Sequence, residues 1–147
     1  MRSFLGLLLL ISGFVVSSLP SRANLGDTLS QCITRYGQPT SHGRGLKKGS
    51  LEWYAFKRGT LENGESFSGG IVVLEVFWKH VGGDVNAPFQ GISKSEREAI
   101  LQEESTIGRW SKPEMKNDSI SWVRTVDGAT AEYRNPLMTL RARAQKT

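Results

Sequence analysis

The chain has 147 residues, a formal net charge of +5 and a single cysteine. The mild basic excess excludes the strongly basic footprint of a nucleic-acid-binding protein, and one cysteine excludes an internal disulfide bond. The length suits one domain that is large enough to bury its own core.

Residues 1–23 have the form of a secretory signal peptide. Arg2 precedes an apolar run from Phe4 to Val16, and the small residues Ser21 and Ala23 follow. This run is shorter than the roughly 20 residues that a membrane-spanning helix needs. We therefore predict cleavage after Ala23, export to the periplasm or the extracellular space, and no stable membrane span after cleavage. A retained membrane anchor is the alternative. Loss of both arginines of this segment lowers the net charge to +3.

A short helix is predicted just after the cleavage site. Thr28 and Gln31 have capping-box spacing, and Gly37 followed by Pro39 is typical of a helix end. Apolar residues recur on one stripe of this helix, namely Leu25, Leu29, Cys32, Ile33 and Tyr36. The position of Cys32 on the stripe predicts a buried thiol that packs as a small hydrophobic side chain.

Other roles for Cys32 are weaker alternatives. A lipid anchor would need a small residue in place of Gln31 and an apolar run that reaches the cysteine. A catalytic thiolate would need a neighbouring histidine, and only His42 and His80 exist. A monomer and a Cys32-linked dimer both stay open, as does a structural protein whose chains are cross-linked through this thiol.

Strands and one further helix are predicted along the rest of the chain. Ser93 and Glu96 form a second capping box that begins a helix over residues 93–105. Strand-forming runs cover residues 51–59, 69–80, 119–126, 129–134 and 137–143. Asn63-Gly64 and Asp127-Gly128 predict hairpin turns.

Two stretches of the chain are similar at a constant offset. Ser50–Gly59 and Ser119–Gly128 share a serine, an aliphatic residue, a tryptophan and a glycine in place. We therefore predict one α+β domain over residues 24–147 with a weak internal repeat, about 25–80 and 92–143. The expected architecture is two αββ-type units, with two helices packed on one face of an antiparallel sheet. Trp53 and Trp122 are expected in its core.

The stretch "GDTLSQCITRYGQP" after the secretion signal, followed by strands, resembles the small bacterial envelope proteins of the SmpA/OmlA type and the wider β-lactamase-inhibitor-like fold. Gly26, Thr28, Gly37 and Pro39 occupy the places of that family's helix motif. The chain lacks the family's lipidated cysteine directly after the signal peptide, so membrane anchoring is not carried over. The resemblance implies a non-enzymatic protein-binding module.

Basic side chains cluster in one predicted loop and at the C-terminus. His42, Arg44, Lys47 and Lys48 lie between residues 40 and 50, where they could bind a phosphate, an acidic glycan or an acidic partner. An ordinary solvated loop is the alternative. The C-terminal residues Arg141, Arg143 and Lys146 are interpreted as charges that guard an edge strand against strand addition, with binding as the alternative.

The best candidate for a recognition surface is aromatic. Trp110 stands beside Arg109, and Phe89 belongs to the predicted loop over residues 81–91. Aromatic residues near arginine are typical of binding hot spots and sugar-stacking surfaces. Burial of Trp110 in the core is the alternative.

Catalytic and metal-binding patterns are weak. The two histidines and the cysteine match no metal-ligand spacing. Glu103 and Glu104 belong to a helix that is expected to be solvated on one side. We therefore predict an exported, non-enzymatic interaction module of the cell envelope, without a cofactor or metal, whose partner is a cell-envelope protein. A small envelope hydrolase or a carbohydrate-binding protein, using Trp110, His80 or the basic loop, is the alternative.

Overall fold

The computed structural model describes residues 25–45 and 51–143 of the chain. The predicted signal peptide and the basic residues Lys47, Lys48 and Lys146 lie outside the described residues. The predicted α+β class is confirmed, because two α-helices accompany one eight-stranded antiparallel sheet. None of the helices in the described ranges has the length and the apolar character needed to cross a membrane.

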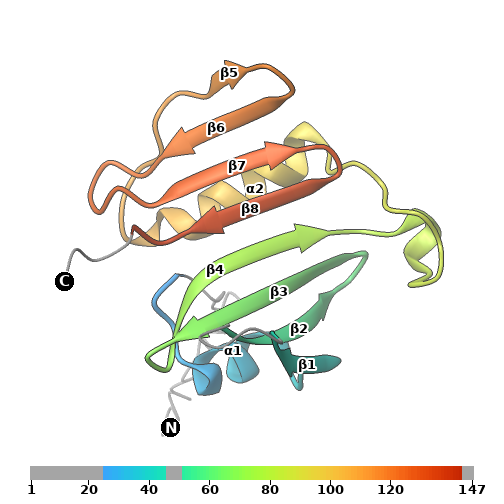
Figure 1. Ribbon diagram of the computed structural model, residues 1–147. Coiled ribbons are helices and arrows are strands. Elements are labelled where there is room, and N and C mark those ends of the chain that lie inside the picture. The colour runs from blue at the N-terminus through green and yellow to red at the C-terminus, as the bar shows by residue number, and fades with distance from the viewer. Residues whose placement is uncertain (1–24, 46–50, 144–147) are drawn as a thin grey trace, which may run out of the picture.

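Each α-helix precedes four strands (Figure 1). The first half contains α1 (Leu29–Tyr36), β1 (Ser41–Arg44), β2 (Glu52–Arg58), β3 (Leu61–Ser68) and β4 (Ile71–Trp78). The second half contains α2 (Lys94–Glu103), β5 (Glu114–Lys116), β6 (Ser119–Val123), β7 (Thr130–Arg134) and β8 (Leu137–Arg141). Short 3₁₀ helices, η1 (Val81–Gly83) and η2 (Glu104–Thr106), flank α2. The prediction of two strands for each helix therefore differs from the observed order.

Both predicted capping boxes are confirmed. Thr28 accepts a hydrogen bond from the backbone N–H of Gln31, whose side chain caps the Thr28 backbone in return, and Gly37 ends α1 with φ +84°. Ser93 and Glu96 make the same reciprocal pair at the start of α2. These caps satisfy backbone donors that the first turn of a helix leaves without partners.

The predicted hairpin turn at Asn63-Gly64 is wrong. Both residues lie inside β3, where Asn63 pairs with Phe77 and Gly64 with Val76 of β4. The chain reverses instead next to β3, at Gly59 before it and at Gly69 after it, with φ +64° and +60°. The hairpin predicted around Asp127-Gly128 is confirmed, since this pair lies between the adjacent strands β6 and β7.

The interpretation of the last strand as an edge strand is also wrong. The strand order is β1-β2-β3-β4-β8-β7-β6-β5, so β8 pairs with both β4 and β7 near the middle of the sheet. The edges are the short strands β1 and β5. The sequence near the C-terminus shows the alternation of β8 but not its neighbours, because β4 and β8 are far apart in the chain. The Arg141 side chain therefore does not guard an edge.

The core lies between the helices and the sheet. Cys32 of α1, Ile100 of α2 and strand residues such as Phe56 and Phe77 are buried in one cluster, which confirms the prediction for Cys32. Trp122 joins this core, but Trp53 does not. The Trp53 side chain is 38% exposed and lies over Gly43 of the neighbouring edge strand, so its predicted core position is wrong.

Candidate functional site

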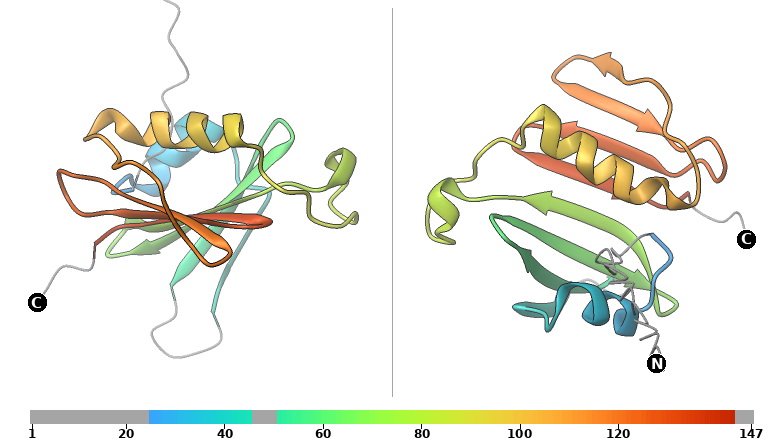
Figure 2. Two further views of the ribbon diagram at one scale, coloured as in Figure 1. Left: turned by 90° about the horizontal axis from the view of Figure 1, so that it is seen from above. Right: turned by 180° about the vertical axis from the view of Figure 1, so that it is seen from behind.

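The connection between β4 and α2, residues 79–91, protrudes from the sheet. We call it the β4–α2 loop. It extends beyond the strand ends both in the view from above and in the view from behind (Figure 2). The backbone N–H of Gln90 donates to the Lys79 carbonyl at 2.8 Å, and that of Val81 donates to the Pro88 carbonyl at 3.0 Å. These hydrogen bonds close the base of the loop as a short antiparallel ladder.

Side chains anchor both arms of this loop. The His80 Nδ1 atom is 2.6 Å from the Ala87 carbonyl oxygen, and the His80 and Phe89 rings lie 4.8 Å apart. The Lys79 ammonium donates to the Glu96 carboxylate of α2 at 2.9 Å. Partial burial opposes ionisation of Glu96, but hydrogen bonds from Lys79 and Ser93 outweigh it and lower the pKa of Glu96. The loop is therefore tied to its own base and to the first turn of α2.

Apolar side chains are exposed along the β4–α2 loop. Val81 is 52% exposed, Val85 is 60% exposed and Phe89 is 53% exposed. A fixed backbone that presents several apolar side chains to solvent is a typical feature of a binding surface. The predicted site residue Phe89 belongs to this surface.

The structure does not bring Trp110 and Arg109 next to Phe89. Phe89 precedes α2 and Trp110 follows it, and the ten residues of α2 span about 15 Å. Trp110 is half-buried against the core, with the Arg124 guanidinium 5.3 Å from its ring centre. Arg109 is exposed, and its backbone carbonyl accepts a hydrogen bond from the Thr125 N–H.

The predicted basic loop is described only in part. His42 and Arg44 lie on the edge strand β1 with exposed side chains, and the His42 ring stacks on Tyr54 at 5.7 Å. Arg44 stands opposite Glu52 of β2 in the strand register. These contacts give His42 and Arg44 a structural role at the edge of the sheet.

A cluster of buried carboxyl groups was missed by sequence reasoning. Glu65 of β3 and Glu75 of β4 are cross-strand partners, and both are fully buried. Glu104 of η2 is 1% exposed, so the expected solvated position of this glutamate is wrong. The signal was present in the sequence, because Glu75 interrupts the apolar run of the strand predicted over residues 69–80.

Burial raises the pKa of all three carboxyl groups. Desolvation and the neighbouring acids raise the pKa of Glu65 to about 7 and that of Glu104 to about 8, and they raise the pKa of Glu75 well above its usual range. Within the described part of the chain, neither carboxyl oxygen of Glu75 has a hydrogen-bond partner. A proton on the Glu65–Glu75 pair allows one carboxyl to donate to the other. Asn63 Nδ2 donates a hydrogen bond to Glu65 Oε1, and the other groups that interact with this pair are Asp27, Cys32, Tyr36, Arg58 and Glu104.

Arg124 connects Glu104 to the β6–β7 connection. Its guanidinium donates to the Glu104 carbonyl at 2.9 Å and to the Asp127 carboxylate at 2.6 and 3.0 Å, and it is 3.7 Å from Glu104 Oε2. The Leu25 N–H also donates to Glu104 Oε2 at 3.3 Å. Arg124 and Glu104 are buried, so they hold η2, the sheet and the segment before α1 together and are not open to a substrate, whereas the Asp127 side chain is 40% exposed.

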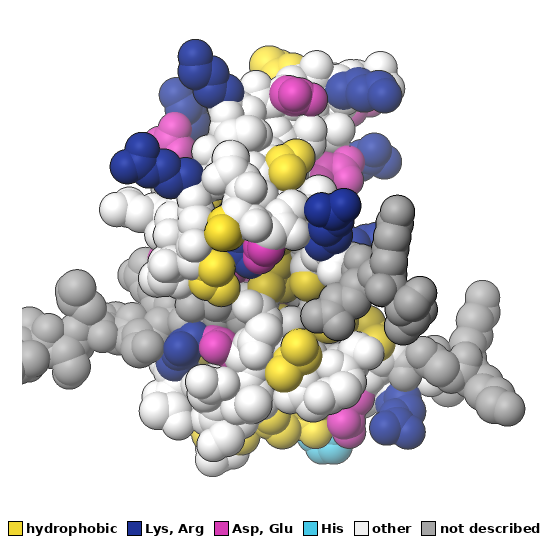
Figure 3. All heavy atoms as spheres, turned by 90° about the vertical axis from the view of Figure 1, so that its left-hand side faces the viewer, with side chains coloured by type: hydrophobic (Ala, Val, Ile, Leu, Met, Phe, Trp, Pro, Cys, Tyr) yellow, Lys and Arg dark blue, Asp and Glu magenta, His cyan; other side chains and the backbone are white. Residues whose placement is uncertain are grey.

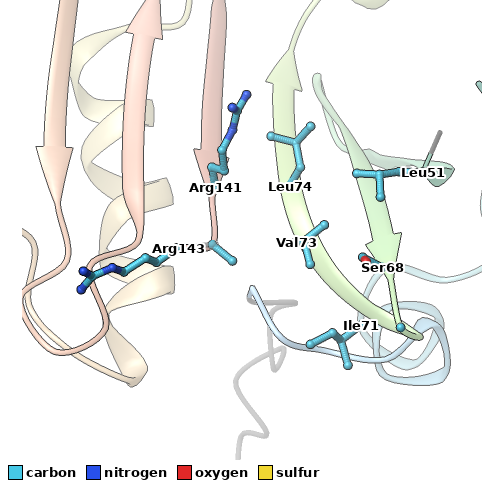
Figure 4. Close-up of a pocket in the computed structure, with 9 residues that line it drawn as sticks. Leu51, Ser68, Ile71, Val73, Leu74, Arg141 and Arg143 are labelled. Atoms are coloured by element: carbon cyan, nitrogen blue, oxygen red, sulfur yellow. The ribbon is translucent and has the colours of Figure 1, made fainter. Parts of the chain in front are cut away.

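A groove of about 790 Å³ lies where the start of β4 meets the end of β8 (Figure 4). Ile71, Val73 and Leu74 of β4 form its apolar side, and Arg141 of β8 stands beside Leu74. Arg143 contributes to the lining, but its side chain points away from the other labelled side chains. The groove therefore combines an apolar wall with one guanidinium group.

Charges elsewhere on the surface are mixed. Figure 3, which shows the side of the molecule at the left of Figure 1, has basic side chains beside acidic ones with apolar side chains between them. In the described ranges, no three histidine, cysteine, aspartate or glutamate side chains are arranged to hold a metal ion.

Comparisons with known proteins give no match: no family model, no curated protein and no solved structure is similar to this chain. The geometry therefore defines an α+β domain with two exposed candidate sites, the β4–α2 loop and the groove beside Arg141.

Proposed function

We propose that the chain is an exported, non-enzymatic interaction module of the bacterial cell envelope that binds a partner protein through the β4–α2 loop. The observation that carries this proposal is the exposure of Val81, Val85 and Phe89 on a backbone closed by its own hydrogen bonds. Such a surface loses little conformational freedom on binding, so more of its apolar contact contributes to affinity. Export rests on the signal-peptide pattern of residues 1–23.

We further propose that the domain is a duplicated unit with both helices on one face of the sheet, like the β-lactamase-inhibitor-like proteins that the sequence resembles. The mirrored strand order about β4 and β8 supports this view, as does the position of both helices in front of the sheet in the view from behind (Figure 2). In this proposal each unit has four strands rather than two.

An envelope hydrolase is the second candidate, and one observation favours it. The His80 Nε2 atom lies 3.9 Å from the Glu62 Oε1 atom, which is a histidine–carboxylate pair of the kind used in acid–base catalysis. The opposite ring nitrogen is engaged with the Ala87 carbonyl, and Phe89 lies against the ring. These contacts favour a structural role for the pair as an anchor of the loop.

The test uses residues 24–147 as bait in envelope extract of the source organism, with retained proteins identified by mass spectrometry. The variants are Val85→Asp and, as a matched control, Val126→Asp, because the two valines are 60% and 61% exposed. We expect a partner retained in near-stoichiometric amount by the natural chain and by V126D, and lost with V85D. Equal retention by all three chains, or no retained protein at any salt concentration, would overturn the proposal.

A further inference from the structure

Arg141 is an unusual residue for its place in the sheet. It ends β8, which is flanked by β4 and β7, so its charge has no role in protecting an edge. Its side chain is exposed, and its guanidinium makes no hydrogen bond or ion pair with any residue in the described ranges. By contrast, Arg134 of β7 is also exposed but pairs with Glu132 at 3.3 Å.

Apolar side chains of β4 lie on one side of Arg141. Leu74 is its cross-strand partner there, and the two side chains lie next to each other in Figure 4, while Thr130 of β7 is its partner on the other side. Ile71 and Val73 continue the apolar wall along β4, and Ile71 is 41% exposed. Leu51 lies across the groove on the side of β2, and Ser68 and Gly69 form its end at the β3–β4 turn.

We propose that this groove binds an extended segment of a partner protein in which an acidic side chain is flanked by apolar residues. A guanidinium group matches a carboxylate geometrically and can donate two parallel hydrogen bonds to it. The apolar side chains of the segment would cover Ile71, Val73 and Leu74, which lose contact with water on binding.

A polypeptide suits the groove better than a lipid chain does. Sites for small apolar ligands bury most of the ligand surface, whereas this groove has an exposed Ile71 side chain and an exposed Ser68 on its lining. The Ser68 hydroxyl and the backbone of the β3–β4 turn can form hydrogen bonds with the polar backbone of a peptide. The positive charge of Arg141 selects an acidic segment over a basic one.

This groove is a second binding surface, separate from the one in the proposed function. It adjoins the first residues of β4, whereas the β4–α2 loop follows the last residue of that strand. The two surfaces can therefore be inactivated independently, and V85D leaves the groove residues unchanged.

The experiment measures binding of short peptides to residues 24–147 by fluorescence anisotropy. The peptides are acetylated and amidated, and they carry aspartate or glutamate between leucine, valine or phenylalanine residues; each has a partner peptide with asparagine or glutamine at the acidic position. The protein variants are Arg141→Gln and the control Arg134→Gln. We expect the acidic peptides to bind the natural chain and R134Q about 10-fold more tightly than they bind R141Q, since a charge-assisted pair is lost.

A charge exchange and a map of the site complete the test. Arg141→Glu is expected to prefer peptides with lysine at the acidic position, and methyl resonances of Ile71, Val73 and Leu74 in the natural chain are expected to shift on titration with the acidic peptides. This second measurement needs no variant, so it stays informative if a substitution at residue 141 disturbs folding.

Several outcomes would overturn the proposal. These are equal affinity for the acidic and amide peptides, resonance shifts confined to other parts of the molecule, or no binding at millimolar peptide. Binding of phosphatidylglycerol vesicles without binding of any peptide would identify a lipid surface instead. A dimer that dissociates in R141Q, measured by light scattering, would identify a second copy of the chain as the occupant.

Discussion

The indole ring of Trp78 lies over the backbone of Gly64, so that a Cβ atom at residue 64 would come within 3.1 Å of the ring atom Cζ3. Gly64 is in the middle of β3, and Trp78 ends the neighbouring strand β4. The glycine therefore provides space for the ring rather than a turn. The dipeptide Asn63-Gly64 has the sequence of a hairpin turn, but tertiary packing determines its conformation.

Replacement of Gly64 by valine is expected to destabilise the fold. A branched side chain must displace the Trp78 ring, and overpacking of this kind typically costs about 1–3 kcal/mol. In a Trp78→Leu background the same replacement is expected to be neutral or stabilising, because valine favours strands and the ring is gone. Urea denaturation of the four chains measures this coupling. An equal cost of G64V in both backgrounds would contradict the prediction.

The stability of the protein is expected to fall as the pH rises from about 5 to 9. The folded-state pKa values of Glu65 and Glu104 are raised to about 7 and about 8, so the folded state binds more protons than the unfolded state in this range. Their stabilising contribution is complete below the unfolded pKa of about 4.5 and is lost as the pH passes through the raised values. Asp127 has a lowered pKa, through its hydrogen bond from Arg124, and its contribution is lost only at more acidic pH.

Glu75→Gln is the variant that tests this pH dependence. A neutral amide at the centre of the cluster removes the repulsion with Glu65 and Glu104 that acts at alkaline pH. We expect E75Q to be more stable than the natural chain at pH 9, and its pH profile to be flatter. Glu98→Gln, at an exposed position of α2, is the control and should leave the profile unchanged. An identical profile for E75Q would disprove the prediction.

Sequence patterns predict local structure in this protein better than they predict which strands pair with each other. The caps of α1 and α2 and the burial of Cys32 follow from residues a few positions apart, and the structure confirms them. The neighbours of β8 depend on pairing with β4, more than sixty residues away in the chain, so the sequence alone does not show that Arg141 stands near the middle of the sheet. The interpretation of Arg141 as a charge on an edge strand therefore gave no indication of the groove.

The buried glutamates show a second reason why part of the structure could not be predicted from the sequence. Strand alternation places Asn63, Glu65 and Phe67 on one side of β3, but a pattern with two polar residues does not mark that side as buried. The burial of these side chains depends on the packing of η2 and α1 against the sheet. Trp53 is the opposite case, because the alignment with Trp122 suggests a core position although the two rings differ in exposure, 38% against 9%.

Replacement of Arg124 by methionine is expected to cost about 1–3 kcal/mol of folding free energy, because it leaves the buried Glu104 carbonyl without its hydrogen-bond donor. Arg124 is 1% exposed and holds Glu104 and Asp127 by hydrogen bonds at 2.6–3.0 Å. The same replacement at Arg134, whose ion pair with Glu132 is exposed, should cost under about 1 kcal/mol. Guanidinium denaturation of both variants gives the comparison, and equal costs would contradict the structural role of Arg124.

The Cys32 thiol is expected to be unreactive in the folded protein. Its side chain is fully buried, and burial together with Glu65 and Asp27 raises its pKa to about 12, so almost no thiolate forms at neutral pH. A disulfide-exchange reagent such as Ellman's should react at the rate of unfolding, and a non-reducing gel of native protein should show no cross-linked dimer. Rapid labelling of the native chain, or a dimer that disappears on reduction, would instead show that this part of the core opens readily.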